Sequence, residues 1–161
     1  MLKNKYIKLA VIAGLVVFFD QVTKAVILDR LPLYQSIEVL PGMFNLTHIQ
    51  NPGGAFGFLA NISPLWRHSI FIIAASLATG LILYFYLDTP KSKPLLAFGL
   101  ALIFGGAVGN MIDRIRYGKV IDFLDFYIND LHWPAFNIAD SAVSIGVVIF
   151  IYHLILKRER V

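Results

Sequence analysis

The chain has 161 residues, of which 58% are hydrophobic and 15% charged, and its mean hydropathy is +0.71. This composition excludes an ordinary soluble domain, and the length allows a single domain. Cysteine is absent, which excludes disulfides, thiolate metal sites and a cysteine nucleophile.

The apolar residues form long blocks rather than the short alternating segments of a β-barrel. A helix needs about 20 residues to cross the hydrocarbon core of a bilayer. The sequence therefore predicts one membrane-embedded domain over residues 1–161, with transmembrane helices over residues 9–28, 69–87, 94–112 and 139–156. The first helix follows several lysines and lacks an A-x-A-like cleavage site, so we expect an uncleaved signal anchor.

Basic residues indicate the orientation of the four helices. Eight Lys or Arg residues lie in the two tails and in the short turn 88–93: Lys3, Lys5, Lys8, Lys91, Lys93, Lys157, Arg158 and Arg160. The longer connections, residues 29–68 and 113–138, contain fewer for their length. By the positive-inside rule, both termini are expected in the cytoplasm (N-in/C-in) and both longer connections on the outer face. The net charge of +4 then needs no nucleic acid to explain it.

The two outer connections differ in pattern. In residues 29–68, strand-forming residues are interrupted by Pro41-Gly42 and Pro52-Gly53-Gly54, which predicts a small sheet or hairpin on the membrane surface. In residues 113–138, the stretch "VIDFLDFYINDLHW" is aromatic and amphipathic, which is typical of an interfacial segment.

Polar residues gather at the outer ends of three of the predicted helices. They are Asp20, Gln21 and Lys24 in the first, Asn110, Asp113 and Arg114 in the third, and Asn137 and Asp140 in the fourth. Each has a structural interpretation: an i,i+4 ion pair for Asp20 and Lys24, an interfacial pair for Asp113 and Arg114, a helix cap for Asn137, and a favourable helix-dipole position for Asp140. Their convergence on one membrane edge favours a shared site.

Two carboxylates on neighbouring elements suggest aspartic peptidase chemistry. Such a pair shares a proton, so that the ionised acid activates water and the protonated acid polarises a carbonyl. Asp140, at a helix N-terminus, is expected to be the ionised base, although a coupled pair titrates as a unit. An alternative interpretation of Asp122 is a solvated loop acid, and Asp125 and Asp130 are expected to be such acids.

Other chemistries fit less well. His48, His68, His132 and His153 are scattered without metal-ligand spacing, and no H-E-x-x-H motif is present. A Ser/Lys peptidase built from Ser141 or Ser144 with Lys24 is disfavoured, because the neighbouring Asp20 would hold the lysine charged. Gly105, Gly106 and Gly109 are expected to permit close helix packing rather than phosphate binding.

Five motifs resemble, in order, those of the lipoprotein signal peptidases, the type II signal peptidases of bacteria. They are "FDQVTK" (19–24), "NPGGAF" (51–56), "GGAVGNMIDR" (105–114), "GKVIDF" (118–123) and "FNIADS" (136–141). The resemblance implies an outer-face β-cradle and an interfacial periplasmic helix above the four transmembrane helices. It also implies the catalytic pair Asp122 and Asp140, with Asp122 rather than Asp125 as the first member. Supporting or substrate-binding positions carry over to Asp20, Lys24, Asn51, Gly53, Asn110, Asp113, Arg114 and Asn137.

The resemblance further implies an activity. Members cut the signal peptide from diacylglyceryl-modified prolipoproteins before the lipidated cysteine, in the bacterial cytoplasmic (inner) membrane with the active site on the periplasmic side. They need no metal or other cofactor, contact membrane lipids, and are inhibited by globomycin-type cyclic peptides. Gly54 departs from the small residue alanine that is common there, and a slightly looser turn is expected.

Two other classes of function remain as alternatives. A small ion-coupled transporter could use Asp20, Lys24 and Asp140 as a relay, but it predicts polar residues through the whole depth of the membrane. Here the inner halves of the helices are nearly free of charge. A non-catalytic lipoprotein-binding protein could have the same cleft, but it would not require two acids.

Overall fold

The computed structural model describes residues 4–53 and 62–156. It contains helices α1 (Lys5–Arg30), α2 (Pro64–Asp88), α3 (Pro94–Tyr117) and α4 (Ile138–Leu156). All four are long and apolar enough to cross a membrane, and each contains one of the apolar segments identified in the sequence. The expected α-helical membrane architecture is thereby confirmed. Gly54, with its expected turn, and the tail residues Lys3, Lys157, Arg158 and Arg160 lie outside the described residues.

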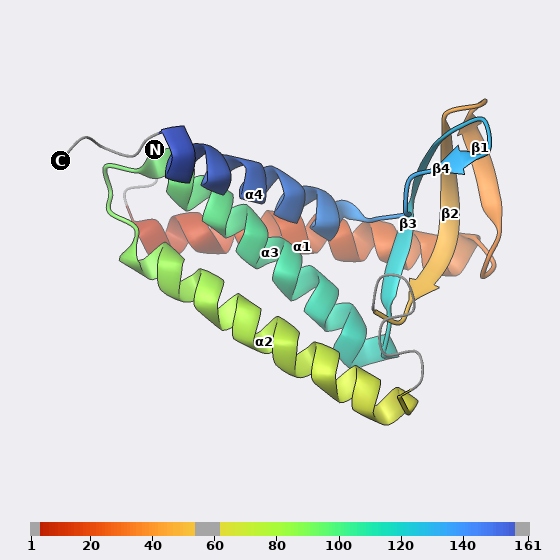
Figure 1. Cartoon of the computed structure of the whole chain (residues 1–161), viewed down its shortest axis with the longest axis horizontal. Helices are drawn as coiled ribbons and strands as arrows, with labels where there is room; N and C mark the ends of the chain where they lie inside the picture. Colours follow the sequence, from red (N-terminus) through yellow and green to blue (C-terminus); the bar gives the residue numbers. More distant parts are fainter. Residues whose placement is uncertain (1–3, 54–61, 157–161) are drawn as a thin grey trace.

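Local signals set the ends of these helices. The Asn4 side chain caps α1 by accepting the N–H of Tyr6, and Ser63 precedes α2, which begins at Pro64. Proline also begins α3, which ends at Gly118 in the left-handed conformation with φ +71°. These caps place the α2–α3 turn at one end of the bundle and the start of β3 at the other (Figure 1).

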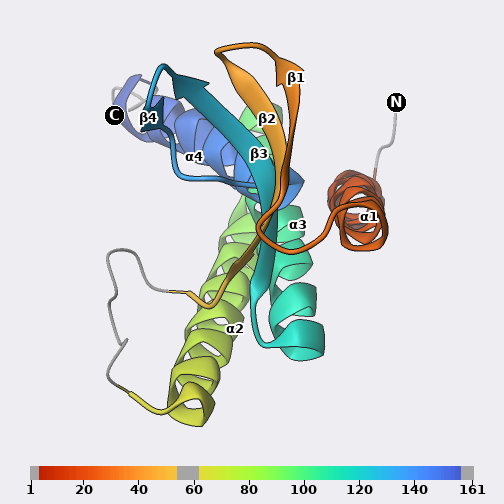
Figure 2. The ribbon, with the colours of Figure 1, turned by 90° about the vertical axis from the view of Figure 1, so that its right-hand side faces the viewer.

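Helix α3 is the centre of the bundle, and α1, α2 and α4 all pack against it (Figures 1 and 2). Glycines permit this approach: a Cβ on Gly105 would lie 2.9 Å from the Ala13 backbone of α1, and one on Gly106 would collide with the Ala139 carbonyl of α4. The packing role expected for these glycines is confirmed. Among the described residues, α2 packs along α3 and touches α1 only near its own end, where the Tyr86 hydroxyl donates to the Lys5 carbonyl.

A four-stranded antiparallel sheet covers the end of the bundle opposite to the start of α1 and the end of α4 (Figure 1). Its strands are β1 (Ser36–Leu40), β2 (Phe44–Asn51), β3 (Val120–Ile128) and β4 (Leu131–His132), in that order across the sheet. The first connection thus supplies the expected hairpin, β1–β2. The second connection supplies the other two strands, and β2 pairs directly with β3.

The predicted interfacial periplasmic helix in residues 113–138 is wrong. Helix α3 continues to Tyr117, and the aromatic stretch that follows forms β3 and β4. The stretch is rich in β-branched and aromatic residues, which pack well on a pleated surface. Ile121 and Phe123 join a buried cluster with Ile27 of α1, and the backbone of β3 pairs with β2. Pairing along the neighbouring strand therefore determines the conformation of this stretch.

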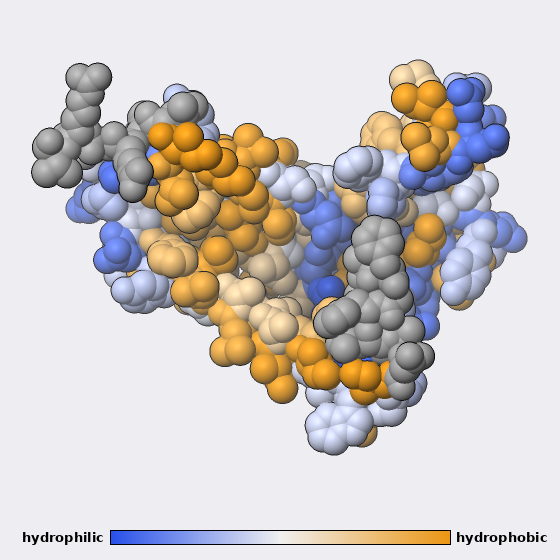
Figure 3. Space-filling view, viewed as in Figure 1, coloured by the Kyte–Doolittle hydropathy of each residue, from blue (hydrophilic) through white to orange (hydrophobic). Residues whose placement is uncertain are grey.

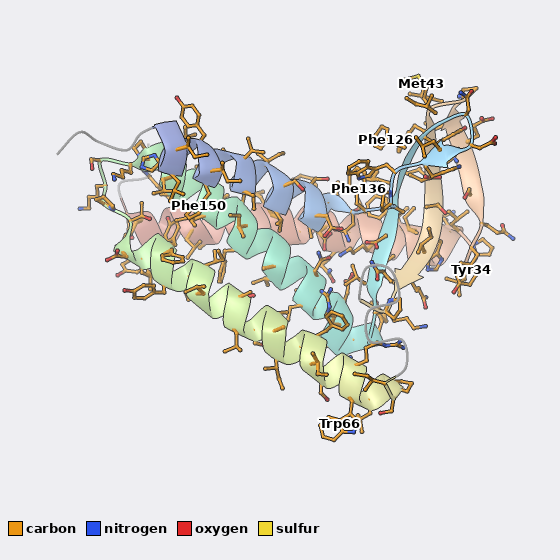
Figure 4. All side chains as sticks on the ribbon, in the orientation of Figure 1. Tyr34, Met43, Trp66, Phe126, Phe136 and Phe150 are labelled. Carbon is orange, nitrogen blue, oxygen red and sulfur yellow. The ribbon has the colours of Figure 1, made fainter. Side chains whose placement is uncertain are left out.

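The helices present large apolar side chains on their outer surface, whereas the sheet is more hydrophilic (Figure 3). On the face that Figure 3 shows, the molecule is hollowed between the apolar helices and the sheet, and hydrophilic residues lie inside this hollow. Aromatic rings stack beside the sheet: Phe126 lies 4.7 Å from Phe44 and 5.9 Å from Phe136, between ring centroids (Figure 4). Polar groups thus lie where the lipid-facing surface meets the sheet.

Candidate active site

Asp122 lies on β3, opposite Ile49 of β2, and is only 3% exposed. The pairing of β2 with β3 shifts register between Leu46 and Ile49, and such bulges change the direction in which neighbouring side chains point. Asp122 and Asp125 are three positions apart on one strand and therefore point to opposite faces. The segment "DFLD" offers two acids, and the strand geometry places only one of them on the face of the candidate site.

Two asparagine side chains donate to the Asp122 carboxylate. Asn137 Nδ2 lies 2.7 Å from Oδ1, and Asn51 Nδ2 lies 3.1 Å from Oδ2. Asn51 is itself fixed by a turn, in which its Oδ1 accepts the N–H of Gly53 at 2.9 Å. Gly53 has φ +87°, and a Cβ there would lie 2.7 Å from the Phe71 ring, so the position favours glycine on both counts.

Asp140 lies in the first turn of α4 and is half-buried. The Asn137 side chain caps this helix by accepting the Asp140 N–H at 2.9 Å, and Asp140 Oδ2 accepts the Asn137 N–H at 3.2 Å in return. Asn110 Nδ2 of α3 donates to Asp140 Oδ1 at 2.8 Å. Asn137 is therefore a helix cap, as one interpretation of the sequence expected, and also a partner of Asp122.

The two carboxylates belong to one hydrogen-bond network. Asn137 bonds to both Asp122 and Asp140, and its Nδ2 also lies 3.2 Å from Asn110 Oδ1. Burial, followed by the charge of Asp140, raises the pKa of Asp122 from 3.8 to about 6, although the bonds from Asn51 and Asn137 oppose this shift. Asp122 is thus suited to retain a proton beside a second carboxyl group.

A buried cluster of charges lies behind this network. Lys24 of α1 forms ion pairs with Asp20 at 2.9 Å and with Asp113 of α3 at 2.7 Å, and the side chains of all three are at most 2% exposed. Lys24 Nζ also donates to Asn110 Oδ1 at 3.0 Å. The expected pairing of Asp20 with Lys24 is confirmed. The interpretation of Asp113 as the partner of Arg114 is wrong, because Asp113 is turned toward Lys24 in the interior.

Each aspartate of the cluster also holds a backbone N–H next to one of the two site carboxylates. Asp20 Oδ1 accepts the N–H of Ala139 at 3.0 Å, and Asp113 Oδ2 accepts the N–H of Ile121 at 3.1 Å. Ala139 directly precedes Asp140, and Ile121 directly precedes Asp122. The cluster therefore fixes α4 and β3 at the residues adjacent to the paired carboxylates.

Arg114 lies at the edge of the site and is half-buried. Its Nη1 donates to the Asn110 carbonyl at 3.1 Å, and its charge interacts with Asp140, Asp113 and Asp122. A guanidinium has five N–H donors, and within residues 4–53 and 62–156 this bond uses one of them, which leaves donors for another acceptor such as a carbonyl group. The Arg114 side chain is thus held by α3, and its guanidinium lies where it interacts with both carboxylates.

Several other sequence candidates lie apart from the site. Asp125 is buried and bonded to Asn45 and His132, so the expectation of a solvated acid was wrong for it, whereas Asp130 is exposed as expected. The burial of Asp125 follows from its place on β3, which pairs with β2 on one edge and with β4 on the other. Ser141 donates to the Asn137 carbonyl at 2.9 Å, and Lys24 is held between two carboxylates, which argues against a Ser/Lys pair.

Gln21 was expected among the converging polar residues, but the resemblance assigned it no supporting role. Its Nε2 lies 3.1 Å from Asp20 Oδ2 and 2.9 Å from Asp113 Oδ1, so it supplies a second link between the two aspartates. Its position at the outer end of the first helix, within the "FDQVTK" motif, was the signal for this role. Ala139 and Ile121 donate backbone N–H groups, so their side chains gave no indication of this role in the sequence.

Comparison with known proteins gives consistent matches. A model of the family described as signal peptidase (SPase) II matches residues 12–156. The lipoprotein signal peptidase of Desulforapulum autotrophicum is 51% identical, with 94% of each chain covered, and that of Syntrophus aciditrophicus is 46% identical, with 98% covered. A solved bacterial membrane enzyme superposes with a TM-score of 0.83 at 33% identity, covering 95% of this chain and 94% of that one.

The helical membrane fold and a site in which two carboxylates meet are characteristic of a membrane-embedded aspartic peptidase. The chain belongs to the signal peptidase II family, whose members here are lipoprotein signal peptidases. The resemblance seen in its motifs is confirmed, and so is the class of enzyme. The family assignment favours a peptidase over the transporter and the binding protein that the sequence left as alternatives.

Proposed function

We propose that this peptidase cuts diacylglyceryl-modified prolipoproteins immediately before the lipidated cysteine, using Asp122 and Asp140 as its catalytic pair. The observation that supports this most directly is the shared network, in which Asn137 bonds to both carboxylates. It supports a pair that shares one proton, as peptide hydrolysis by two aspartates requires.

In the proposed reaction, Asp140 begins ionised and Asp122 protonated. Asp140 takes a proton from water as the water oxygen attacks the scissile carbonyl, and Asp122 gives its proton to the carbonyl oxygen. The resulting gem-diol then collapses: Asp122 recovers the proton, Asp140 passes its proton to the leaving nitrogen, and the C–N bond breaks. The raised pKa of Asp122 and the N-terminal position of Asp140 in α4 support this assignment.

The supporting residues have distinct proposed roles. Asn51, held by Gly53, and Asn137 orient Asp122, while Asn110 orients Asp140. Arg114 is proposed to hold a carbonyl group of the substrate backbone or of its ester. Asp20, Lys24 and Asp113 are proposed as positioning residues. The two aspartates accept backbone N–H groups next to the catalytic acids, and Lys24 holds both aspartates and Asn110 in place.

The substrate is proposed to enter laterally from the bilayer. Among the described residues, α2 and α4 each pack on α3 but not on each other, and α2 diverges from α4 toward the sheet (Figure 1). A helical signal peptide could lie in this opening with its cleavage point at the level of Asp140. The sheet above it would contact the part of the substrate that follows the cleavage point. A globomycin-type cyclic peptide is proposed to compete for the same space.

The site is proposed to face the periplasmic side of the inner membrane, with both termini in the cytoplasm. Lys5, Lys8, Lys91 and Lys93 all lie at the end of the bundle opposite to the sheet, as the positive-inside rule requires for this orientation. Labelling of single cysteines in intact cells tests it. Positions 39 and 91 are suitable: an impermeant maleimide should label the first and not the second, and the reverse pattern would contradict the orientation.

The test of function is cleavage of a diacylglyceryl-modified prolipoprotein by purified protein in detergent, with a chelator present. Asp122→Asn and Asp140→Asn should each abolish cleavage while the variants remain folded. Asp130→Asn is the matched control, because Asp130 is exposed on the β3–β4 turn, and it should keep the parent rate. Full activity in either catalytic variant would overturn the proposed pair.

A further inference from the structure

A second polar site lies at the opposite end of the molecule from the catalytic pair. A cavity of about 260 Å³ opens between the start of α1, the α2–α3 turn and the start of α3. Three lysines line it: Lys5 and Lys8 from α1, and Lys91 from the turn. The peptidase reaction makes no use of this cavity, since the sheet and the catalytic pair lie at the other end of the bundle (Figure 1).

The lysines are held around the cavity by the ends of the helices. The Tyr86 hydroxyl donates to the Lys5 carbonyl at 2.7 Å, and Lys5 Nζ donates to the Leu87 carbonyl near the end of α2 at 2.5 Å. Lys8 is half-buried one turn further along α1. Among the described residues, no carboxylate lines the cavity and no ion pair involves these three lysines. Within the described part of the chain, the cavity therefore carries a positive charge that no ion pair compensates.

The wall of the cavity changes character with depth along the helices. The lysines and Thr89 line the mouth of the cavity, which is the part nearest the helix ends. Ile12, Ala97 and Phe98 line it on the side toward the middle of α1 and α3. An ammonium group binds a phosphate as a point charge, and the apolar side chains suit a hydrocarbon chain. The cavity thus has the polarity of an amphiphile, with an anionic head at the mouth and an acyl chain along the helices.

The depth of the cavity in a membrane is consistent with such a ligand. It lies where α1 begins, α2 ends and α3 begins, which is the level at which apolar helices leave the hydrocarbon core. Basic pockets between transmembrane helices at this level bind anionic lipid headgroups. The charge also argues against the substrate as the occupant, because the N-terminal region of a signal peptide is itself positively charged.

We propose that this cavity is a binding site for an anionic glycerophospholipid, with its phosphate between Lys5, Lys8 and Lys91 and the beginning of one acyl chain against Ile12 and Phe98. The site goes beyond the peptidase function, and its occupancy is measured without reference to cleavage. A soluble phosphate compound would contact only the lysines at the mouth of the cavity, whereas a phospholipid would also contact the apolar side. The two can therefore be distinguished by experiment.

The experiment is native mass spectrometry of the full chain in a neutral detergent, titrated with phosphatidylglycerol or with phosphatidylcholine of the same acyl chains. Phosphatidylglycerol should bind at least tenfold more tightly than phosphatidylcholine. Lys8→Gln and Lys91→Gln should each weaken phosphatidylglycerol binding about fivefold, as expected for one lysine near an anionic headgroup. Lys119→Gln is the matched control at the sheet end and should leave the affinity unchanged.

Three outcomes would overturn the proposal. They are equal binding of the two lipids, unchanged phosphatidylglycerol binding in both lysine variants, and displacement of phosphatidylglycerol by millimolar glycerol 3-phosphate, which would indicate a soluble phosphate site. Cleavage of a prolipoprotein by the same variants, measured in detergent, reports whether they are folded. Because these lysines lie away from the catalytic pair, a failure of lipid binding with normal cleavage contradicts this proposal alone.

Discussion

Asp20 and Ala139 are separated by 119 positions in the chain, yet Asp20 Oδ1 accepts the backbone N–H of Ala139 at 3.0 Å. This bond ties α1 to the first turn of α4, one residue before Asp140. Asp113 forms the equivalent bond to Ile121, one residue before Asp122, at 3.1 Å. The two proposed catalytic acids are thus fixed in the same way from one buried cluster.

A first prediction concerns this positioning role. Asp20→Ala removes the acceptor for the Ala139 N–H and should lower kcat about a hundredfold, the cost of a small misplacement of a catalytic group, with KM changed by less than threefold. Asp20→Asn keeps an acceptor oxygen and should recover part of this loss. Steady-state kinetics on a prolipoprotein substrate measures both. Equal losses in the two variants, or a loss confined to KM, would contradict the positioning role.

The pH dependence of cleavage follows from the pKa of Asp122. Because the proposed reaction requires a protonated Asp122 and the pKa of this carboxyl is about 6, kcat/KM should fall above pH 6, by about tenfold per pH unit. Asn51→Ala removes a hydrogen bond that favours the ionised form, so the fall should move to higher pH. Asn45→Ala is the control, since Asn45 bonds to Asp125 on the same pair of strands. A fall at the same pH in the Asn51 variant would contradict the assignment.

Asp122 should also make the protein less stable at alkaline pH. Its pKa is raised on folding, so its contribution to stability is fully present below pH 4 and is lost as pH rises through about 6. The difference is on the order of 3 kcal/mol. Thermal unfolding in detergent should therefore show that Asp122→Asn raises Tm relative to the parent by clearly more at pH 8 than at pH 4.5. A variant less stable than the parent at pH 8 would contradict this account.

The helix contacts predict a contrast between two glycines. A Cβ on Gly106 would collide with the Ala139 carbonyl, whereas a Cβ on Gly14 has no atom within 4 Å. Gly106→Ala should therefore destabilise the protein by about 1–3 kcal/mol through overpacking. Gly14→Ala should be neutral or stabilising, because alanine is favoured over glycine in a helix. Thermal unfolding of both variants in the same detergent decides the matter, and equal Tm values would count against close packing at Gly106.

The helices could be predicted from the sequence because long apolar blocks carry their own signal. The strand β3 could not, since the stretch from Val120 to Ile128 is equally compatible with an amphipathic interfacial segment. Its conformation depends on pairing with β2, about 70 residues earlier in the chain. The position of Asn137 predicted a helix cap, but its bond to Asp122 depends on how β3 meets the start of α4.

The motifs named most of the residues that the structure brings together, whereas the connections between them could not be predicted. The motifs named Asp20, Lys24 and Asp113, and neither spacing nor residue type showed that one lysine lies between the two acids. Backbone partners such as Ile121 are invisible in a sequence, since any residue except proline offers the same N–H. Only the three-dimensional arrangement reveals which positions depend on one another.

The sharing of Lys24 between two carboxylates limits how this region can change over time. Replacing the lysine alone leaves two acids in the interior without a counter-ion, and replacing either acid alone removes one of the two backbone anchors. An apolar substitution of all three would restore electrical balance but would release both anchors at once. Single substitutions at positions 20, 24 and 113 should therefore be poorly tolerated in evolution, and changes at these positions should occur together.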